Sequence, residues 1–313
     1  MDHSADESST SPTRPSNASP LSAKESRKYG SAGEGLGRGA LKELARKHGL
    51  RPRRRLGQHF LADPNLARRI VEFSGVGPGE NALEIGAGLG SLTIPLAETG
   101  ARVLAVELDA RLLPAFQEAV GGYENVTILA ADALLVEWEE VLAGGKWKMA
   151  SNLPYSVAAP LVIGMLERGL PIDSYLVMVQ REVGERLSAG PGDKGYGAAS
   201  VHVSYWAEGK VLRRVPRTVF WPEPRVDSVL LRLEPRAEPP VGAGAESLFR
   251  VVDEGFRQRR KTMKNALRRL GLEPSHASEI LVSAGVPADV RAEALGLEDF
   301  ARVAEYVDEA VGD

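Results

Sequence analysis

Short runs with strand character, separated by longer amphipathic stretches, dominate the middle of this chain. The runs lie at 82–85, 102–106, 126–129, 148–151 and 175–179. Before and between them, apolar residues recur with a helical period at 66–73, 92–99, 111–120, 159–168 and 180–188. Strands that alternate with helices are typical of a parallel sheet with helices on its faces. The pattern therefore predicts an α/β domain over residues 51–235.

The last part of the chain changes to a purely helical pattern. Extended segments are predicted at 200–206, 210–215 and 228–233, and residues 235–245 read as a linker. An apolar stripe then continues from Glu246 to a glycine, Gly271, that suits a helix C-cap; its members are Leu248, Val252, Phe256, Met263, Leu267 and Leu270. Two more helices are predicted at 276–284 and 297–309. We therefore expect residues 246–313 to form a small all-α domain.

The beginning of the chain lacks the large apolar residues that a folded domain needs. It is rich in Ser, Pro, Gly and charged residues, and such a segment cannot bury enough surface to offset its ordering entropy. We therefore expect residues 1–50 to be a disordered N-terminal extension, within which residues 40–48 have the pattern of a short basic helix.

Composition excludes several classes of protein. With 43% hydrophobic and 26% charged residues, the chain has the balance of an ordinary globular protein. It has no cysteine, which excludes disulfides and thiolate metal sites and fits a cytoplasmic location. No apolar run is long enough for a membrane span, and the N-terminus lacks the apolar core of a secretory signal. We therefore expect neither a membrane partner nor a metal.

Charge restricts where nucleic acid could bind. The formal net charge is −3, so any such contact must come from local basic patches. One candidate is Arg51, Arg53, Arg54 and Arg55. The other lies in the helical tail and comprises Arg257, Arg259, Arg260, Lys261, Lys264, Arg268 and Arg269. We expect the tail domain to bind RNA through this second patch, although each patch alone could equally be a solvated face.

Three consecutive predicted strands end in residues that suit an adenosyl ligand. The first is followed by glycines at 86, 88 and 90, a turn that presents backbone N–H groups without a Cβ in the way. The second ends at Glu107, which can accept hydrogen bonds from both ribose hydroxyls, and the third at Asp132, which can accept from an adenine amino group. The glycine spacing differs from that of NAD-binding turns, so S-adenosylmethionine is the better candidate.

The fourth strand end carries the chemistry of amine methylation. Asn152-Leu153-Pro154-Tyr155 follows the run at 148–151. The lone pair of adenine N6 is conjugated with the ring, so N6 is a poor nucleophile. The Asn152 amide oxygen and the Leu153 carbonyl can accept hydrogen bonds from the two N–H groups of N6. Tyr155 can stack on the base, and Pro154 stiffens the turn. The sulfonium supplies the methyl, so positioning carries most of the catalysis.

These motifs identify a family. The chain resembles the ribosomal RNA adenine dimethyltransferases of the kasugamycin-resistance type over about residues 51–310. The matching segments are LGQHFL (56–61), LEIGAGLGSLT (83–93), AVELD (105–109), SNLPYSVAAPL (151–161), VQREVGERL (179–187), YGAASV (196–201), FWPEPRVDSVLLRL (220–233) and FRQRRKTMKNAL (256–267). Two departures are Ala87, where the family usually has Pro, and Ala198-Ala199, where Arg-Leu is more usual and where one RNA contact is expected to be lost.

The resemblance implies a function, a fold and a set of site residues. The function is S-adenosylmethionine-dependent dimethylation of N6 of two adjacent adenosines in the 3′-terminal hairpin of small-subunit rRNA, in a pre-30S particle and by a monomer. The fold is a Rossmann-like class I methyltransferase with a seven-stranded sheet and a small all-α C-terminal domain. The implied cofactor contacts are His59, Leu61, Gly86, Glu107, Asp132 and Asn152. Phe220 is implied as a second aromatic wall for the base, with a core aromatic as the equally supported alternative.

Three other functions remain open on the sequence. A macrolide-resistance methyltransferase of large-subunit rRNA would share fold and chemistry, but Leu153 and the FRQRRKT run favour the small-subunit enzyme. A non-catalytic ribosome-assembly factor is disfavoured by the intact Asn152–Tyr155 motif. Methylation of a protein glutamine, which uses an N-P-P-Y site, is disfavoured by Leu153 and by the basic tail.

Overall fold

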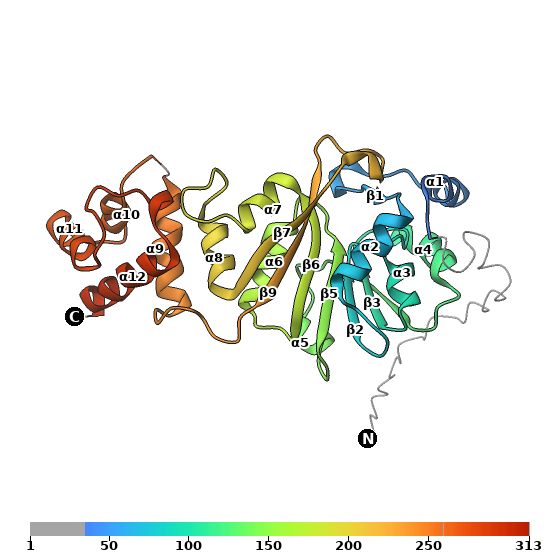
Figure 1. Ribbon diagram of the computed structural model, residues 1–313, viewed down its shortest axis with the longest axis horizontal. Helices are drawn as coiled ribbons and strands as arrows, with labels where there is room; N and C mark the ends of the chain where they lie inside the picture. Colours follow the sequence, from blue (N-terminus) through green and yellow to red (C-terminus); the bar gives the residue numbers. More distant parts are fainter. Residues whose placement is uncertain (1–34, 259, 313) are drawn as a thin grey trace, which may run out of the picture.

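The computed structural model describes residues 35–258 and 260–312. An α/β body lies at one end of an elongated molecule and the C-terminal helices lie at the other (Figure 1). Residues 1–34 of the expected extension lie outside the described residues. None of the described helices is both long and apolar enough to cross a bilayer.

Seven strands form one mixed sheet in the order β4-β3-β2-β5-β6-β9-β7. The pairs from β4 to β6 are parallel, as predicted, whereas β9 is antiparallel to both β6 and β7. The sequence predicted no direction for β7 and β9; as antiparallel neighbours they need no crossover helix between them. The bounds are β2 Asn81–Ile85, β3 Arg102–Glu107, β4 Val126–Ala130, β5 Trp147–Asn152, β6 Ile172–Gln180, β7 Ala207–Val215 and β9 Ser228–Pro235.

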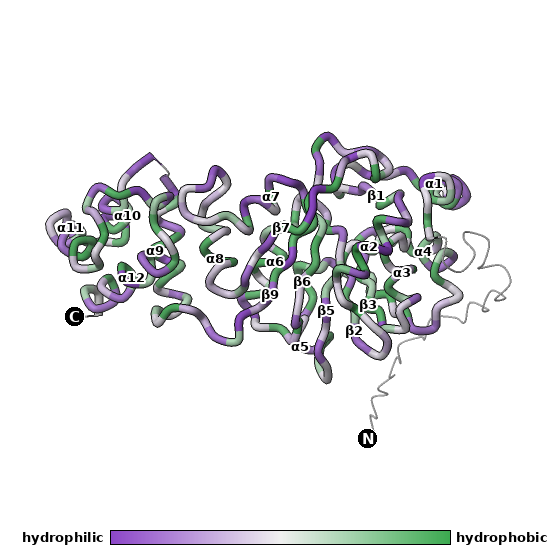
Figure 2. The backbone as a smooth tube through the Cα atoms, in the orientation of Figure 1, coloured by the Kyte–Doolittle hydropathy of each residue, from purple (hydrophilic) through white to green (hydrophobic). Residues whose placement is uncertain are grey.

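Both faces of the sheet are covered by helices. In β6, Tyr175 and Val177 pack into one core with α5, α6 and α7, while Leu176 and Met178 pack into the other with α2 and α3. This alternation follows from the two-residue period of a strand. The central strands are accordingly mostly hydrophobic along their length (Figure 2). The helix bounds are α2 Pro64–Ser74, α3 Thr93–Glu98, α4 Leu113–Val120, α5 Trp138–Val141, α6 Ala158–Glu167 and α7 Arg181–Leu187.

A small second sheet closes over the carboxyl end of the large one. Strand β1 (Phe60–Leu61) pairs antiparallel with β8 (Phe220–Trp221). The pairing joins the LGQHFL segment to the FWPEP segment, which lies far away in the sequence. It places both next to the glycine turn and the Asn152–Tyr155 turn.

Residues 198–206 are a helix, α8 (Ala198–Trp206), and not the extended segment that the sequence predicted. Val203 packs into the core of the α/β body, while Val201 and Tyr205 pack into the core of the C-terminal helices. A helix that is buried on two sides has no single apolar stripe, so its alternating apolar residues resemble a strand.

The C-terminal helices form the predicted all-α unit, with two differences. The apolar stripe from Leu248 to Leu270 is divided between α9 (Ala245–Arg257) and α10 (Met263–Arg269), followed by α11 (Pro274–Ser283) and α12 (Leu297–Gly312). Its core also contains Tyr196, Val201 and Tyr205, so the unit shares α8 with the α/β body and does not begin abruptly at residue 246. Gly271 has φ +100° after α10, as a C-cap requires.

The first described helix, α1 (Arg38–Lys47), corrects the expectation that residues 1–50 are a disordered extension. Leu41 and Leu44 are completely buried against α4, in the same core as Phe116. The Arg38 guanidinium donates to the Phe220 carbonyl at 2.9 Å, which ties α1 to β8. The short helix predicted at 40–48 is therefore confirmed, and it belongs to the α/β body.

Candidate active site

A cleft at the carboxyl ends of β2, β3, β4 and β5 contains every residue that the sequence assigned to cofactor binding. His59, Leu61, Gly86, Glu107, Asp132 and Asn152 all line it, together with Leu153, Pro154 and Tyr155. Adjacent parallel strands end at the same edge, so residues far apart in the sequence converge here. Figure 1 shows this edge at the top of the sheet, beside β1.

The glycine turn requires glycine for a reason that the sequence did not reveal. Gly86, Gly88 and Gly90 all have positive φ, at +81°, +60° and +91°. A Cβ on Gly88 would lie 2.9 Å from the Phe60 ring, and one on Gly86 would lie 3.2 Å from the Asn152 carbonyl oxygen. The glycines therefore let the turn pack against β1 and the Asn152–Tyr155 turn. Ala87 donates its N–H to the Val106 carbonyl at 3.2 Å, a bond that a proline could not make.

The Glu107 carboxylate is held in place by two backbone N–H groups. Gly88 donates to Oε2 and Asp109 donates to Oε1, each at 2.8 Å. Burial raises the pKa of Glu107 despite these bonds. Each oxygen keeps a second lone pair, so the group can accept from ribose hydroxyls while it stays fixed.

Asp109 has a structural role that differs from that of Glu107. It caps the turn after β3, and the Arg111 guanidinium and the Gln58 amide donate to it. Its bond from Arg111 holds the pKa of Asp109 at about 2. Gln58, which the sequence analysis did not single out, thereby anchors the LGQHFL segment to the end of β3.

The Asp132 side chain lies at the third strand end, as predicted. Its Oδ1 accepts from the Leu134 N–H at 3.0 Å. Two leucines line the same part of the cleft although they are largely open to solvent, Leu108 at 55% and Leu134 at 46% exposure. They provide an apolar contact for an adenine ring beside the polar contact that the Asp132 carboxylate offers. The sequence analysis did not identify Leu108 as a cleft residue. Its position as an apolar residue between the two carboxylates of AVELD was the signal that could have done so.

The Asn152 side chain is oriented by the backbone just before β1. Its Nδ2 donates to the His59 carbonyl at 3.1 Å, which leaves its Oδ1 as the atom that can accept from a substrate. Leu153 is buried, and its N–H donates to the Met178 carbonyl at 3.1 Å. Hydrogen bonds therefore hold the turn against His59 on one side and against β6 on the other.

The Tyr155 and His59 rings form a small aromatic cluster at the cleft. Their centroids are 5.6 Å apart with an interplanar angle of 24°. The Tyr155 hydroxyl is 2.9 Å from Ser228 Oγ, and His59 Nδ1 donates to the Pro222 carbonyl at 2.7 Å. The tyrosine ring is therefore held by the Ser228 hydroxyl and by the His59 ring, which Pro222 holds in turn. Among the described residues, no group of histidine and acidic side chains is arranged to hold a metal ion.

Phe220 does not form a wall of the cleft, which corrects that assignment. Its side chain is completely buried in the core with Ile70, and it is absent from the cleft lining. Pairing with Leu61 in the β1–β8 sheet turns the ring inward. The alternative reading, a core aromatic beside prolines, is the one that the structure shows.

Beneath the glycine turn lies a buried acid that the sequence analysis passed over. Glu84, in β2, is 1% exposed and accepts from Thr93 Oγ1 at 2.5 Å. Burial raises the pKa of Glu84 to about 8. Ser91 also lines the cleft, and its Oγ has no hydrogen-bond partner among the described residues. Both side chains add polar character to the cofactor end of the cleft.

The two basic patches differ in their surroundings. Arg55, of the first patch, lines the cleft. In the second patch Glu254 pairs with both Arg257 and Arg269, which reduces the local positive charge. Arg260 and Lys261 remain exposed, and Arg259 lies outside the described residues.

The donor set fits S-adenosylmethionine. Fixed carboxylates at two strand ends suit the adenosine hydroxyl and amino groups, and exposed leucines suit the ring. Bound in this cleft, the cofactor would supply a methyl group on a sulfonium.

Comparisons with known proteins give the same picture. A family model described as ribosomal RNA adenine dimethylase matches residues 49–309. The Ribosomal RNA small subunit methyltransferase A of Moorella thermoacetica is 44% identical over 270 residues, covering 83% of this chain and 94% of that protein. The protein of the same name from Thermobifida fusca is 42% identical over 271 residues, covering 85% and 94%.

Solved structures agree on the fold. The 23S rRNA methyltransferase ErmE superimposes with a TM-score of 0.62 and 28% identity over 80% of this chain and 99% of its own. A dimethyladenosine transferase from Plasmodium falciparum has a TM-score of 0.67 at 22% identity, over 78% and 96%, and supports the fold alone. The fold is that of a class I methyltransferase with an all-α C-terminal unit. With the family match spanning the α/β body and most of the C-terminal helices, this chain belongs to the ribosomal RNA adenine dimethylase family.

Proposed function

We propose that this protein transfers methyl groups from S-adenosylmethionine to adenine N6 in small-subunit ribosomal RNA, giving N6,N6-dimethyladenosine. The observation that best supports the proposal is the hydrogen bond from Asn152 Nδ2 to the His59 carbonyl. This bond orients the amide so that its oxygen can accept from a substrate N–H. It lies in the same cleft as the residues suited to an adenosyl group.

The chain's own groups account for the chemistry at N6. The amino nitrogen must become tetrahedral before its lone pair can attack a methyl group. Asn152 Oδ1 and the Leu153 carbonyl accept hydrogen bonds from the two N–H groups and stabilise the tetrahedral nitrogen. These hydrogen bonds stabilise the transition state more than the ground state. Tyr155, held by Ser228, supports the base by stacking. A monomethylated N6 keeps one N–H, so the same site can act a second time.

The small subunit is favoured over the large subunit as substrate. The relatives from Moorella thermoacetica and Thermobifida fusca, both named as small-subunit enzymes, are 44% and 42% identical, whereas ErmE is 28% identical. Leu153 in the N-L-P-Y motif points the same way. We infer further that the targets are two adjacent adenosines of the 3′-terminal hairpin, that the substrate is a pre-30S particle in the cytoplasm, and that the enzyme acts as a monomer with its C-terminal helices contacting RNA.

The test is methylation of small-subunit particles that lack the modification. Purified protein and S-adenosylmethionine should convert two adjacent adenosines to N6,N6-dimethyladenosine, detected by mass spectrometry of nuclease fragments. Asn152→Ala protein serves as the inactive control, and large-subunit particles serve as the competing substrate. Dimethylation of large-subunit RNA alone, or of neither RNA, would contradict the proposal.

A further inference from the structure

A second groove at the same edge of the sheet is lined by arginines and is not part of the cofactor cleft. Arg68 and Arg69 come from α2, and Arg213 and Arg214 come from β7; we call these four the arginine groove. Asp63, Asn65, Leu66, Glu72, Val215, Pro216 and Val219 complete its lining. None of the motifs that identify the family includes the four arginines.

A β-bulge lies directly before the two arginines that β7 contributes to the groove. Beyond the bulge, Arg213 pairs with Leu230 and Arg214 with Val229. The register of β7 against β9 shifts between Val211 and Arg213, so the intervening residue is left without a partner. Such a bulge bends the edge strand and increases its local twist beside the groove, and bulges often lie beside active sites.

The groove lies close to the reacting end of the cleft. Val215, next to Arg214, pairs with Ser228, whose Oγ is 2.9 Å from the Tyr155 hydroxyl. On the other side, α2 begins directly after β1, whose Leu61 lines the cleft. A nucleotide with its base at Tyr155 would therefore have its neighbours within reach of the groove.

The charge of the groove favours an anion. Arg69, Arg213 and Arg214 are exposed and form no ion pair within the part of the chain that the structure describes. Arg68 donates to the Asn65 side chain at 2.7 Å. Of the two carboxylates, Asp63 accepts from two backbone N–H groups as the N-cap of α2, and Glu72 is exposed. Four arginines against two carboxylates leave the groove positive in a chain whose net charge is −3.

We propose that the arginine groove binds phosphates of the RNA strand next to the adenosine that is methylated. The inference rests on the proposed function, because it is the substrate base in the cleft that brings a polyanionic backbone to this edge. Guanidinium groups form paired hydrogen bonds with phosphate oxygens, and such contacts fix the register of a nucleic acid without reading its sequence. The groove thereby positions the target adenosine for the cleft.

The test compares the double variant Arg213→Gln/Arg214→Gln with wild type in binding transcribed small-subunit rRNA over a range of salt concentrations. Each lost phosphate contact should reduce the slope of log affinity against log salt by about 0.7–0.9, so the double variant should lose about 1.5 and bind about tenfold more weakly. In methylation of particles KM should rise by a similar factor, while kcat at saturating RNA and the Kd for S-adenosylmethionine stay within twofold.

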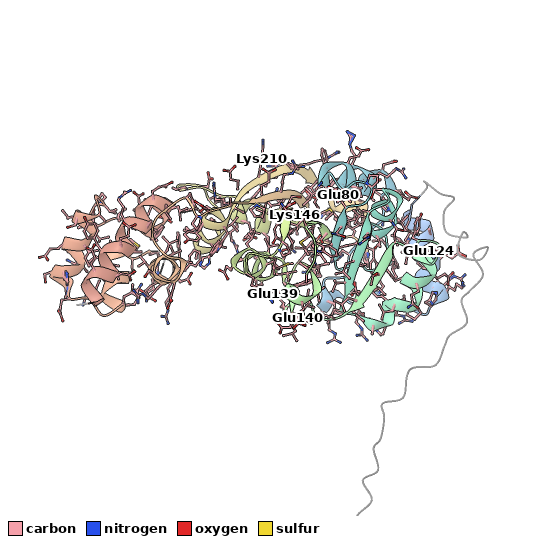
Figure 3. All side chains as sticks on the ribbon, turned by 90° about the horizontal axis from the view of Figure 1, so that it is seen from below. Glu80, Glu124, Glu139, Glu140, Lys146 and Lys210 are labelled. Carbon is pink, nitrogen blue, oxygen red and sulfur yellow. The ribbon has the colours of Figure 1, made fainter. Side chains whose placement is uncertain are left out.

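Two controls make the result specific. Arg102→Gln/Lys146→Gln removes equal charge from the opposite edge, where Lys146 lies just before β5 (Figure 3), and should leave RNA binding within twofold of wild type. Glu72→Gln removes a carboxylate from the groove and should tighten RNA binding by about twofold.

The outcomes separate this inference from the proposed function. If wild type methylates its particles but Arg213→Gln/Arg214→Gln keeps the wild-type salt slope and affinity, the groove does not bind RNA and the function stands. If wild type binds rRNA without methylating adenosine, the proposed function is wrong. The loss of salt slope in the variant would still show whether the arginine groove binds RNA. Equal losses in the double variant and the opposite-edge control would show a general charge effect and would overturn the inference.

Discussion

At the residue scale, the site depends on side chains in which a hydrogen bond to one polar atom leaves another polar atom available for a ligand. Asn152 is the clearest case, since its Nδ2 donates to the His59 carbonyl and its Oδ1 accepts no hydrogen bond within the described part of the chain. The sequence predicted its role but not its orienting partner, which lies 93 residues earlier in the chain.

We expect Asn152→Ala to slow methyl transfer by roughly a hundredfold or more, because it removes one preorganised acceptor whose bond strengthens in the transition state. The measurement is single-turnover transfer at saturating S-adenosylmethionine on particles that lack the methyl groups. Particle affinity should be unchanged, which controls for folding. A rate within threefold of wild type would make Asn152 a structural residue.

Glu84 should give the protein a specific dependence of stability on pH. Its folded pKa is about 8 and its ordinary value is 4.5, so between these values the folded state retains a proton that the unfolded state has released. The stabilising contribution is complete below pH 4.5 and is lost as pH rises through about 8. Glu84→Gln, which cannot ionise, should flatten the fall in urea midpoint between pH 6 and pH 9. Parallel curves for variant and wild type would refute the assignment.

At the element scale, α1 and α8 show where local pattern and tertiary role separate. The sequence predicted the short helix at 40–48 but assigned its surroundings to a disordered extension, because residues before it are polar. Leu41 and Leu44 nevertheless complete the core formed with α4. In α8 the reverse happened: the helix was missed because burial against two cores removes the amphipathic signal.

If α1 is an integral element, Leu44→Ala should destabilise the protein by about 2–5 kcal/mol, the usual cost of truncating a completely buried leucine. Lys42→Ala, two residues away on the exposed face of the same helix, is the matched control and should change stability by less than about 0.5 kcal/mol. Urea unfolding of both variants measures the difference. Equal stabilities would mean that α1 is dispensable for the body.

At the scale of the whole molecule, one histidine joins the α/β body to the C-terminal helices. In α8, His202 Nδ1 lies 2.9 Å from Glu167 of α6 and its Nε2 lies 3.1 Å from Asp253 of α9. Its ring stacks on Phe249 at 3.9 Å. Both ring nitrogens can donate only in the imidazolium form. Burial lowers the pKa of His202, but hydrogen bonds to Asp253 and Glu167 outweigh it and raise the pKa above 6.5.

The His202 contacts should therefore stabilise the junction below pH 6.5 and lose that contribution as pH rises through the raised pKa. A double-mutant cycle of His202→Gln and Asp253→Asn, read by urea unfolding, should give a coupling energy at pH 6 that shrinks by pH 9. Glu279→Gln, in α11 and away from the junction, is the control variant and should couple to neither residue. A coupling energy that is the same at both pH values would contradict a charged bridge.

The sequence alone predicted most of the alternation of strands and helices up to α7, the helical tail, the family and most of the cleft. This was possible because each of Gly86, Glu107, Asp132 and Asn152 follows a predicted strand, and parallel strands end at one edge. Local periodicity and motif position are properties of neighbouring residues, so they can be read without knowing the fold.

Tertiary structure alone decided which side chains face the cleft and which face the core. Phe220 and Tyr155 are both aromatic residues in motifs, yet pairing of β8 with β1 buries the first while a bond to Ser228 keeps the second at the site. The arginine groove likewise needs β7 to lie beside α2, and no local pattern connects these two elements. Such contacts join residues at least 73 positions apart, and their energies depend on burial and orientation, which exist only once the chain has folded.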